Sequence, residues 1–244
     1  MESVFEEWNV YAGKKELVAR AIDLKSVLAS SKLKLIAFSG MRRSGKTSEL
    51  ILLYQLLKKE KEKIAYINLE DSRIKSNRMI LDEILKWFGD EGYLLLDEIT
   101  SVSDWEGWLA RTHELLKGKL KIIVSSSRSN LVIPSKPLRG RMLSYELFPL
   151  SFQEYLKFKG IPIESTTAGI GKIERQLHNY LLYGGFPEAV LLQNSAEHIN
   201  LINSYFKDIV GLDVAEISGE NISTVELFGK YVLEAPTFSA SKCL

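Results

Sequence analysis

One stretch of the sequence decides the fold: Gly40-Met41-Arg42-Arg43-Ser44-Gly45-Lys46-Thr47. It fits the pattern Gly-x-x-x-x-Gly-Lys-Ser/Thr of a phosphate-binding (Walker A) loop. An apolar run over residues 33–38 precedes the loop and predicts a buried strand, and the helical spacing of Leu50, Leu53 and Leu57 follows it. Because this loop requires a strand before it and a helix after it, the stretch predicts a P-loop α/β domain.

The loop residues suit a polyphosphate ligand. Gly40 and Gly45 allow a tight turn whose backbone N–H groups point inward, and the next helix adds the positive end of its dipole. We expect Lys46 to bridge the β- and γ-phosphates of a nucleotide and the Thr47 hydroxyl to ligate Mg²⁺. The predicted nucleotide-binding residues of this segment are Gly40, Arg42, Arg43, Ser44, Gly45, Lys46, Thr47 and Ser48.

Two adjacent carboxylates form a second candidate element of the site. Asp97 and Glu98 directly follow the apolar run 93–96, at the end of a strand where open parallel sheets bind ligands. We expect Asp97 to hold Mg²⁺ through its water shell, and Glu98 to orient and deprotonate an attacking water. An acidic pair alone could be a solvated turn, but together with the loop it favours hydrolysis.

The apolar runs and the helical patterns alternate along the first part of the chain. Such alternation predicts right-handed βαβ crossovers and a mostly parallel sheet, and therefore a three-layer α/β/α P-loop fold with five strands. The predicted strands cover residues 33–38, 64–69, 93–96, 120–124 and, at the edge, 143–148. The predicted helices cover residues 14–30, about 50–60, 79–88 and 105–116.

A polar strand end offers a further nucleotide-binding residue. P-loop proteins with a Glu directly after the acidic Asp normally insert one more strand between the loop strand and the acidic strand. That strand ends in a polar residue facing the γ-phosphate. The strand at 120–124 ends in Ser125-Ser126, so we expect Ser126 to have this role, although serines are common at strand ends.

The second half of the sequence changes character. After Ser151 the helical patterns 152–157, 173–183 and 189–212 replace the strands, and the Gly- and Ser/Thr-containing segment 160–171 reads as a linker. We therefore expect three parts: a nucleotide-binding domain at 1–160, a small helical lid at 161–220 and the beginning of a winged helix at 221–244. Tyr183-Gly184-Gly185-Phe186-Pro187-Glu188 is expected to form a helix–helix corner, with Gly-Gly ending one helix and Pro187 starting the next.

Composition excludes several other classes. The chain has 244 residues, with 32 Lys and Arg against 31 Asp and Glu, and a single Cys that cannot form an internal disulfide. Neither half is strongly basic, so a polycationic nucleic-acid-binding face is not expected. The N-terminus carries Glu2, Glu6 and Glu7 instead of a basic and then apolar signal. We expect a cytoplasmic protein without a membrane partner.

Six segments together carry a resemblance to a known family: residues 40–47, 66–71, 95–99, 140–141, 147–152 and 183–188. With their double Arg in the loop and their Pro-Leu-Ser-Phe stretch, they resemble the prokaryotic AAA-type ATPases that carry a winged helix and an uncharacterised C-terminal domain. The resemblance extends from about residue 12 to 235. It implies ATP (or ADP) as the nucleotide with Mg²⁺, and a nucleotide domain followed by a lid and a winged helix.

By the same resemblance, Arg141 is placed where such ATPases carry a catalytic arginine that reaches a γ-phosphate, within one subunit or across the interface of a homo-oligomer. An ordinary surface arginine is the alternative. The sequence stops just after the expected start of the second helix of the winged helix, so we expect a truncated or shortened form. A DNA or protein partner would then depend on the missing C-terminal region.

The leading interpretation is a Mg²⁺-dependent ATPase in which hydrolysis is coupled to a conformational change. A GTPase is disfavoured, because the chain has no Asn-Lys-x-Asp base-reading motif. A phosphotransferase, with Arg128, Arg139 and Arg141 clamping a phosphate, stays open, although it leaves Glu98 without a function. A nucleotide-gated protein- or DNA-binding module with negligible turnover is the main alternative.

Overall fold

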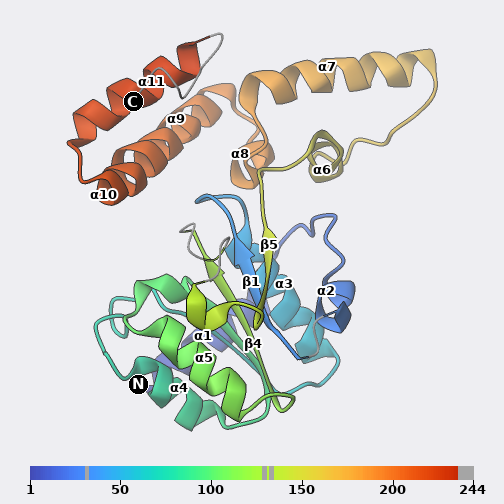
Figure 1. The fold of residues 1–244 in the computed structure, drawn as a ribbon. Helices are drawn as coiled ribbons and strands as arrows, with labels where there is room; N and C mark the ends of the chain where they lie inside the picture. Colours follow the sequence, from blue (N-terminus) through green and yellow to red (C-terminus); the bar gives the residue numbers. More distant parts are fainter. Residues whose placement is uncertain (31–32, 128–130, 132–134, 236–244) are drawn as a thin grey trace. The chain divides into compact units, whose positions relative to one another are not determined.

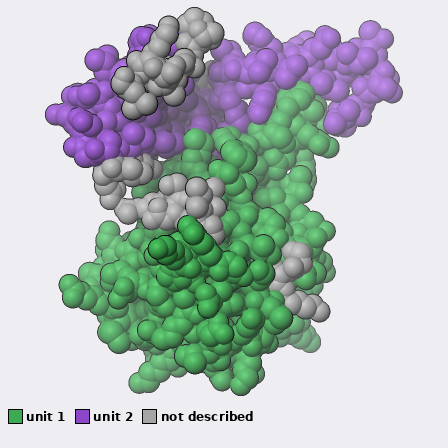
Figure 2. Space-filling view, viewed as in Figure 1, with its two compact units in different colours: residues 1–161 green, residues 162–244 purple. Residues whose placement is uncertain are grey.

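The computed structural model describes residues 1–30, 33–127, 131 and 135–235. The chain divides into two units, Met1–Ile161 and Pro162–Leu244, which Figure 2 distinguishes by colour. Each unit is described by itself. Among the described residues, no helix combines the length and the apolar character that a membrane span needs.

Five parallel strands form the sheet of the first unit, in the order β2-β3-β4-β1-β5 (Figure 1). Their bounds are β1 Leu35–Ser39, β2 Ile64–Asn68, β3 Gly92–Asp97, β4 Leu120–Ser126 and β5 Met142–Glu146. The predicted α/β/α P-loop fold is confirmed. The inserted strand is confirmed as well, because β4 lies between the loop strand β1 and the acidic strand β3.

Helices cover both faces of the sheet because successive residues of each strand point to opposite faces (Figure 1). Leu35 and Ala37 of β1 belong to one apolar core, which also holds α4 (Ile80–Phe88) and α5 (Trp105–Leu115). Ile36 and Phe38 belong to the other core, against α2 (Leu24–Ser30) and α3 (Lys46–Lys59). Strands β1, β3 and β4 are largely buried on both faces, which explains why their sequences are mostly apolar, whereas the edge strand β5 is only partly buried.

The prediction of one helix over residues 14–30 is wrong. The structure has α1 (Glu2–Lys14) and α2 (Leu24–Ser30), and the segment between them is not helical. Helix α1 covers the edge strand β2, where Asn9 Oδ1 accepts a hydrogen bond of 3.0 Å from the Tyr66 amide. This contact satisfies a backbone donor that the edge strand would otherwise leave unpaired.

The unit ends with a connection from the sheet to a short helix. Strand β5 ends two residues earlier than predicted, and residues 147–151, here named the strap, lead to α6 (Phe152–Phe158). Ser151 and Glu154 form a capping box at the start of α6. The described residues of this unit also include 3₁₀ helices at Ile99–Ser101 and Lys136–Leu138.

The described part of the second unit is helical. Its elements are α7 (Thr167–Tyr183), α8 (Pro187–Leu191), α9 (Ser195–Phe206), a π-helix (Lys207–Val214), α10 (Ala215–Ser218) and α11 (Ile222–Glu234). The predicted corner is confirmed, because Gly184 ends α7 and Pro187 begins α8. The predicted continuous helix over 189–212 is wrong, since α8 ends at Leu191 and Asn194 caps α9.

The winged helix predicted for 221–244 can be compared only at its start. Helix α11 includes the predicted helix over 225–232. The predicted turn at 235–237 and the helix at 239–242 lie outside the described residues except for Ala235.

Candidate active site

The sheet brings the two predicted motifs to one edge. The loop 40–47 follows the carboxyl end of β1, and Asp97 and Glu98 lie at the carboxyl end of β3. One strand separates them, and Ser39 at the end of β1 is in register with Ser126 at the end of β4. Because the strands are parallel, the loop, the acidic pair and the polar end of β4 share the edge where such sheets bind ligands.

The loop uses left-handed backbone conformations. Gly40 has a φ of 136° and Gly45 a φ of 101°, and Arg43 between them has a φ of 66°. A Cβ on Gly40 would lie 2.2 Å from the Leu147 carbonyl oxygen. Glycine is therefore required at this position by the backbone angle and by the strap that packs against it.

The side chains of the loop are held close to it. Lys46 is buried, and its Nζ donates a hydrogen bond of 2.9 Å to the Met41 carbonyl oxygen. The hydroxyl oxygens of Ser39 and Ser44 are buried and have no hydrogen-bond partner within the part of the chain that the structure describes. Arg42 forms a 3.8 Å ion pair with Glu70. Thr47 and Ser48, in the first turn of α3, are half-buried.

Asp97 is fully buried and bound by two neutral hydroxyls. The Ser125 hydroxyl donates to its Oδ1, and the Tyr66 hydroxyl donates to its Oδ2 at 2.9 Å. Burial, followed by the nearby Asp97 carboxylate, raises the pKa of Tyr66 far above its usual value. The phenol therefore keeps its proton and stays a donor to Asp97.

Glu98 is held by the end of β4. Its backbone is left-handed, with φ 51° and ψ 52°, which is uncommon for a residue with a side chain. Its Oε2 accepts hydrogen bonds from the Ser127 amide at 2.9 Å and from the Ser127 hydroxyl at 3.1 Å. Its own amide donates to the Ser125 hydroxyl at 3.0 Å. The candidate base is thus restrained by two of the three consecutive serines.

Ser126, which we predicted to face the γ-phosphate, contacts Thr100 in the structure. Its hydroxyl lies 2.7 Å from the Thr100 hydroxyl and is buried. Ser127, which sequence reasoning missed, contacts the candidate base instead. Three consecutive serines at a strand end were the sequence signal for contacts with the acidic pair. Only the structure shows that Ser125 contacts Asp97 and Ser127 contacts Glu98.

The structure separates Arg141 from the other predicted residues. Its carbonyl accepts a hydrogen bond from the Leu35 amide at the amino end of β1, and the length of β1, about 13 Å, lies between it and the loop. Its side chain contacts Glu114 and the Pro137 carbonyl. A catalytic role of Arg141 within its own subunit is therefore wrong, because parallel strands begin at the edge opposite the site.

The position of Arg141 also argues against the phosphotransferase hypothesis, in which Arg128, Arg139 and Arg141 bind a transferred phosphate. Arg139 precedes Arg141 at the amino edge of the sheet, and Arg128 lies outside the described residues. The contribution of Arg141 across a subunit interface stays a prediction.

The donor set at the candidate site suits Mg²⁺. The Thr47 hydroxyl and the Asp97 carboxylate supply oxygen atoms, which are the ligands that this ion prefers, and Mg²⁺ keeps several waters when bound with a substrate phosphate. Among the described residues, no three or more His, Cys, Asp and Glu side chains gather into a metal site. A metal at this edge would therefore depend on phosphate and water for its remaining ligands.

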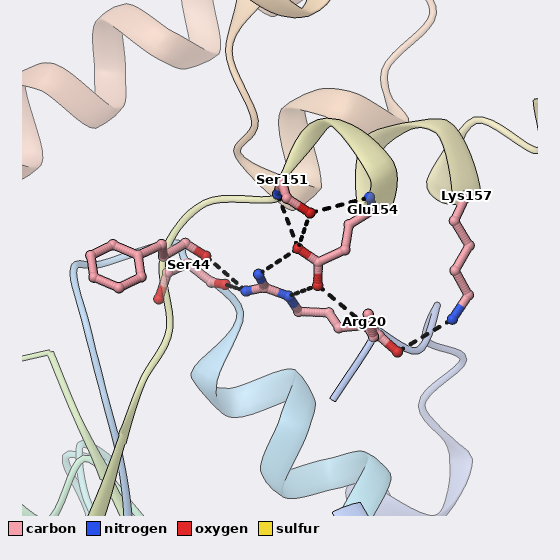
Figure 3. Close-up of polar contacts among 7 residues, drawn as sticks. Arg20, Ser44, Ser151, Glu154 and Lys157 are labelled. Atoms are coloured by element: carbon pink, nitrogen blue, oxygen red, sulfur yellow. Dashed lines mark hydrogen bonds and ion pairs between the residues drawn. The ribbon is translucent and has the colours of Figure 1, made fainter. Parts of the chain in front are cut away.

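A buried charged cluster, which no sequence motif indicates, lies behind the loop (Figure 3). Arg20 contacts Glu154 of α6 through an ion pair of 2.9 Å, and it donates to the Ser44 carbonyl oxygen at 3.0 Å. Glu49 of α3 is also buried, and its Oε1 has no hydrogen-bond partner among the described residues. Burial raises the pKa of Glu49 to about 7, and the Glu154 charge adds to the shift while Arg20 opposes it.

Two families match parts of the chain. A family described as AAA domain matches residues 32–156, just over half of the chain and nearly all of the first unit after α2. A family described as a domain of unknown function (DUF8612) matches residues 174–239.

Curated relatives match over most of this chain. The uncharacterised protein MJ1544 of Methanocaldococcus jannaschii is 33% identical over 214 residues, covering 84% of this chain and 46% of the relative. An uncharacterised protein of Haemophilus influenzae is 28% identical over 193 residues, covering 74% and 46%. The chain spans about half the length of the curated relatives it matches.

Solved structures match more distantly. The AMPPCP-bound DnaA from Aquifex aeolicus is similar with a TM-score of 0.43 and 17% identity, covering 84% of this chain and 73% of that one. The C. elegans PCH-2 structure is similar with a TM-score of 0.41 and 15% identity, covering 84% and 60%. The fold, the loop and the family match over residues 32–156 agree, and the chain belongs to the AAA domain family of P-loop proteins.

Proposed function

We propose that the chain binds ATP with Mg²⁺ and hydrolyses it, and that hydrolysis changes the arrangement of its two units. The observation that carries the proposal is the position of two motifs at the same edge of the sheet. The loop 40–47 follows the end of β1, Asp97 and Glu98 lie at the end of β3, and only β4 lies between these two strands. Residues that hold polyphosphate and residues that activate water are thereby close enough to act on one nucleotide.

Each residue then has a definite task. The loop amides bind the phosphates, and Lys46 exchanges its 2.9 Å bond to the Met41 carbonyl for the β- and γ-phosphates. Thr47 and Asp97 hold Mg²⁺, which neutralises phosphate charge when bound. Glu98 accepts the proton of the water whose oxygen attacks the γ-phosphorus, and the bridging oxygen leaves with ADP.

Before it acts, Glu98 must give up one contact. Its Oε2 accepts two hydrogen bonds from Ser127, so this oxygen is already occupied by donors of the protein. Moving the Glu98 carboxylate towards the attacking water breaks these bonds, either by rotation of the side chain or by a shift between the ends of β3 and β4. We expect nucleotide binding at the loop to favour this shift.

The experiment is phosphate release from ATP, with Mg²⁺ or with EDTA, by the wild type and Lys46→Met. The proposal predicts Mg²⁺-dependent turnover that Lys46→Met reduces at least tenfold together with ATP affinity, since a charged contact to phosphate is lost. Turnover that is equal in EDTA, or equal in Lys46→Met, contradicts the proposal.

A second candidate function is a nucleotide-gated binding module with negligible turnover. The restraint of Glu98 by Ser127 favours it, because the two hydrogen bonds on Oε2 oppose reorientation of the base towards an attacking water. In this function ATP occupancy organises a contact with protein or DNA through the rest of a longer protein. Tight ATP binding without phosphate release, in the wild type and in Glu98→Gln alike, would support this candidate over hydrolysis.

The proposal includes the assembly and the location of the protein. Residues 161–220 act as a helical lid, and the start of a winged helix follows at 221–244. Arg141 of one subunit of a homo-oligomer reaches the nucleotide of its neighbour and makes hydrolysis depend on assembly. A cytoplasmic location fits the net charge of +1 and the single Cys. Sedimentation with ATP and Arg141→Ala turnover test the assembly.

A further inference from the structure

Arg20 uses all of its guanidinium nitrogens in contacts behind the phosphate-binding loop. Nε and Nη2 donate to the two carboxylate oxygens of Glu154 at 2.9 and 3.0 Å. Nη1 donates to the Ser44 carbonyl oxygen at 3.0 Å and to the Phe148 carbonyl oxygen at 2.8 Å. The side chains of Arg20 and Glu154 are each only 9% exposed. One side chain thus joins the loop, the strap and α6 (Figure 3).

The bond to Ser44 fixes the direction of one loop amide. In a planar trans peptide the carbonyl of one residue and the N–H of the next point to opposite sides. When the Ser44 carbonyl points to Arg20, the Gly45 N–H points away from Arg20. In a phosphate-binding loop this amide donates a hydrogen bond to the phosphate, which lies on the inner side of the turn.

Glu154 is itself held in place by α6. Its Oε2 accepts from the Ser151 amide and hydroxyl, both at 3.0 Å, and its Oε1 accepts from the Ala21 amide at 3.3 Å. Burial alone would raise the pKa of Glu154, but the hydrogen bonds from Arg20, Ser151 and Ala21 outweigh it and bring the pKa to about 2. The carboxylate is therefore charged at neutral pH and stays paired with Arg20.

The strap adds a steric contact to the same arrangement. The Leu147 amide donates to the Ser39 carbonyl at 2.7 Å, and the Leu147 carbonyl oxygen lies 2.2 Å from the position that a Cβ on Gly40 would take. The loop is thus held at its first residue by the strap and at Ser44 by Arg20. Both contacts lead to α6, the last helix of the first unit.

We propose that Arg20 is a positioning residue of the nucleotide site. It holds the Ser44 carbonyl outward so that the Gly45 amide faces a bound phosphate, and its pairing with Glu154 makes the shape of the loop depend on α6. The inference rests on the proposed nucleotide binding. By linkage, a nucleotide that needs this loop shape stabilises α6 in return.

The test combines ATP affinity with amide hydrogen exchange in the wild type, Arg20→Met, Arg20→Lys and Glu154→Gln. Ile84→Val is the matched control, because Ile84 is fully buried in α4 on the other face of the sheet and its loss lowers stability without contacting the loop. We expect ATP affinity to fall about tenfold or more in Arg20→Met and less in Arg20→Lys, which keeps the charge but loses the paired contacts. Ile84→Val should bind ATP within about twofold of the wild type.

Hydrogen exchange of the nucleotide-free proteins reports on the loop independently of function. We expect faster exchange over residues 41–46 and 148–157 in Arg20→Met and Glu154→Gln than in Ile84→Val. ATP affinity and exchange in Arg20→Met equal to those of the control would overturn the inference and leave the proposed function standing. A wild type that binds no nucleotide while the exchange pattern appears as expected would overturn the proposed function, and with it the positioning role towards phosphate.

Discussion

At the scale of single residues, Glu49 makes a specific contribution to pH dependence. Burial raises its pKa from 4.5 to about 7, so the folded protein holds a proton that the unfolded chain releases above pH 4.5. The wild type therefore loses stability as the pH rises from about 4.5 to 7, and the loss is complete above 7. The charged groups that act on Glu49 are Arg20, Glu154 and Lys157.

The substitution Glu49→Gln removes this titration and keeps the shape of the side chain. We expect similar stability of the two proteins near pH 4.5, and a variant more stable than the wild type by up to about 3 kcal/mol at pH 8. Urea unfolding at both pH values measures the difference in unfolding free energy between the two proteins. Because both proteins share all other titrating groups, the contributions of those groups cancel. A difference that does not change with pH would contradict the buried, protonated state of Glu49.

Ser127 is expected to restrain catalysis. Ser127→Ala removes the 3.1 Å hydroxyl contact to Glu98 and keeps the amide contact. Because the base is released more easily, we expect kcat to rise about two- to fivefold, a barrier change of at most about 1 kcal/mol, with ATP affinity unchanged. Ser103→Ala, at an exposed serine, is the control. A fall in kcat of tenfold or more would show that Ser127 assists the reaction directly.

At the scale of elements, the contact between the strap and the loop can be isolated with two glycines. Gly40→Ala meets both a left-handed backbone, φ 136°, and the Leu147 carbonyl at 2.2 Å, whereas Gly140→Ala meets only a φ of 73° with open space around it. We expect a loss of unfolding free energy of about 1 kcal/mol for Gly140→Ala and at least about 2 kcal/mol more for Gly40→Ala. Equal losses of unfolding free energy for the two variants in chemical denaturation would show that the strap moves away from the new Cβ without cost.

The sequence predicted the elements whose patterns are unambiguous. Strands buried on both faces are continuously apolar, and the P-loop marks the turn from β1 to α3, so the sheet and its inserted strand were predicted. Helix α1 was missed although Val4, Trp8 and Ala12 have helical spacing and pack in the core, whereas its contact with the edge strand through Asn9 has no signal in the sequence. The segment 15–23 has helical spacing but is not helical, and Arg20 in it contacts the loop.

The site was predicted as far as motifs define it. The loop and the acidic pair were found from spacing alone, but Arg20, Glu154 and Ser127 act through contacts between segments far apart in the chain. The resemblance left open whether Arg141 acts within its own subunit or across an interface, because a resemblance in sequence does not show which edge of the sheet a residue occupies. Its place before a parallel strand would have indicated the amino edge.

At the scale of the whole molecule, the proposed coupling predicts that the two units change their arrangement with the nucleotide. Probes on cysteines at Leu115 and Leu181, both highly exposed and in different units, would report the distance between the units in a Cys243→Ser background. We expect different distance distributions with ADP and with ATP in Glu98→Gln. Identical distributions in both states would contradict coupling, while leaving hydrolysis untouched.

The most direct test of the account is steady-state phosphate release from Mg·ATP by the wild type beside Glu98→Gln, with ATP binding measured in both. The account predicts slow turnover by the wild type, a loss of at least about a hundredfold in Glu98→Gln, as for other general bases, and ATP affinity within about threefold in both proteins. Turnover that survives the substitution would contradict the role of Glu98 as the base. Tight binding without turnover in either protein would contradict hydrolysis itself.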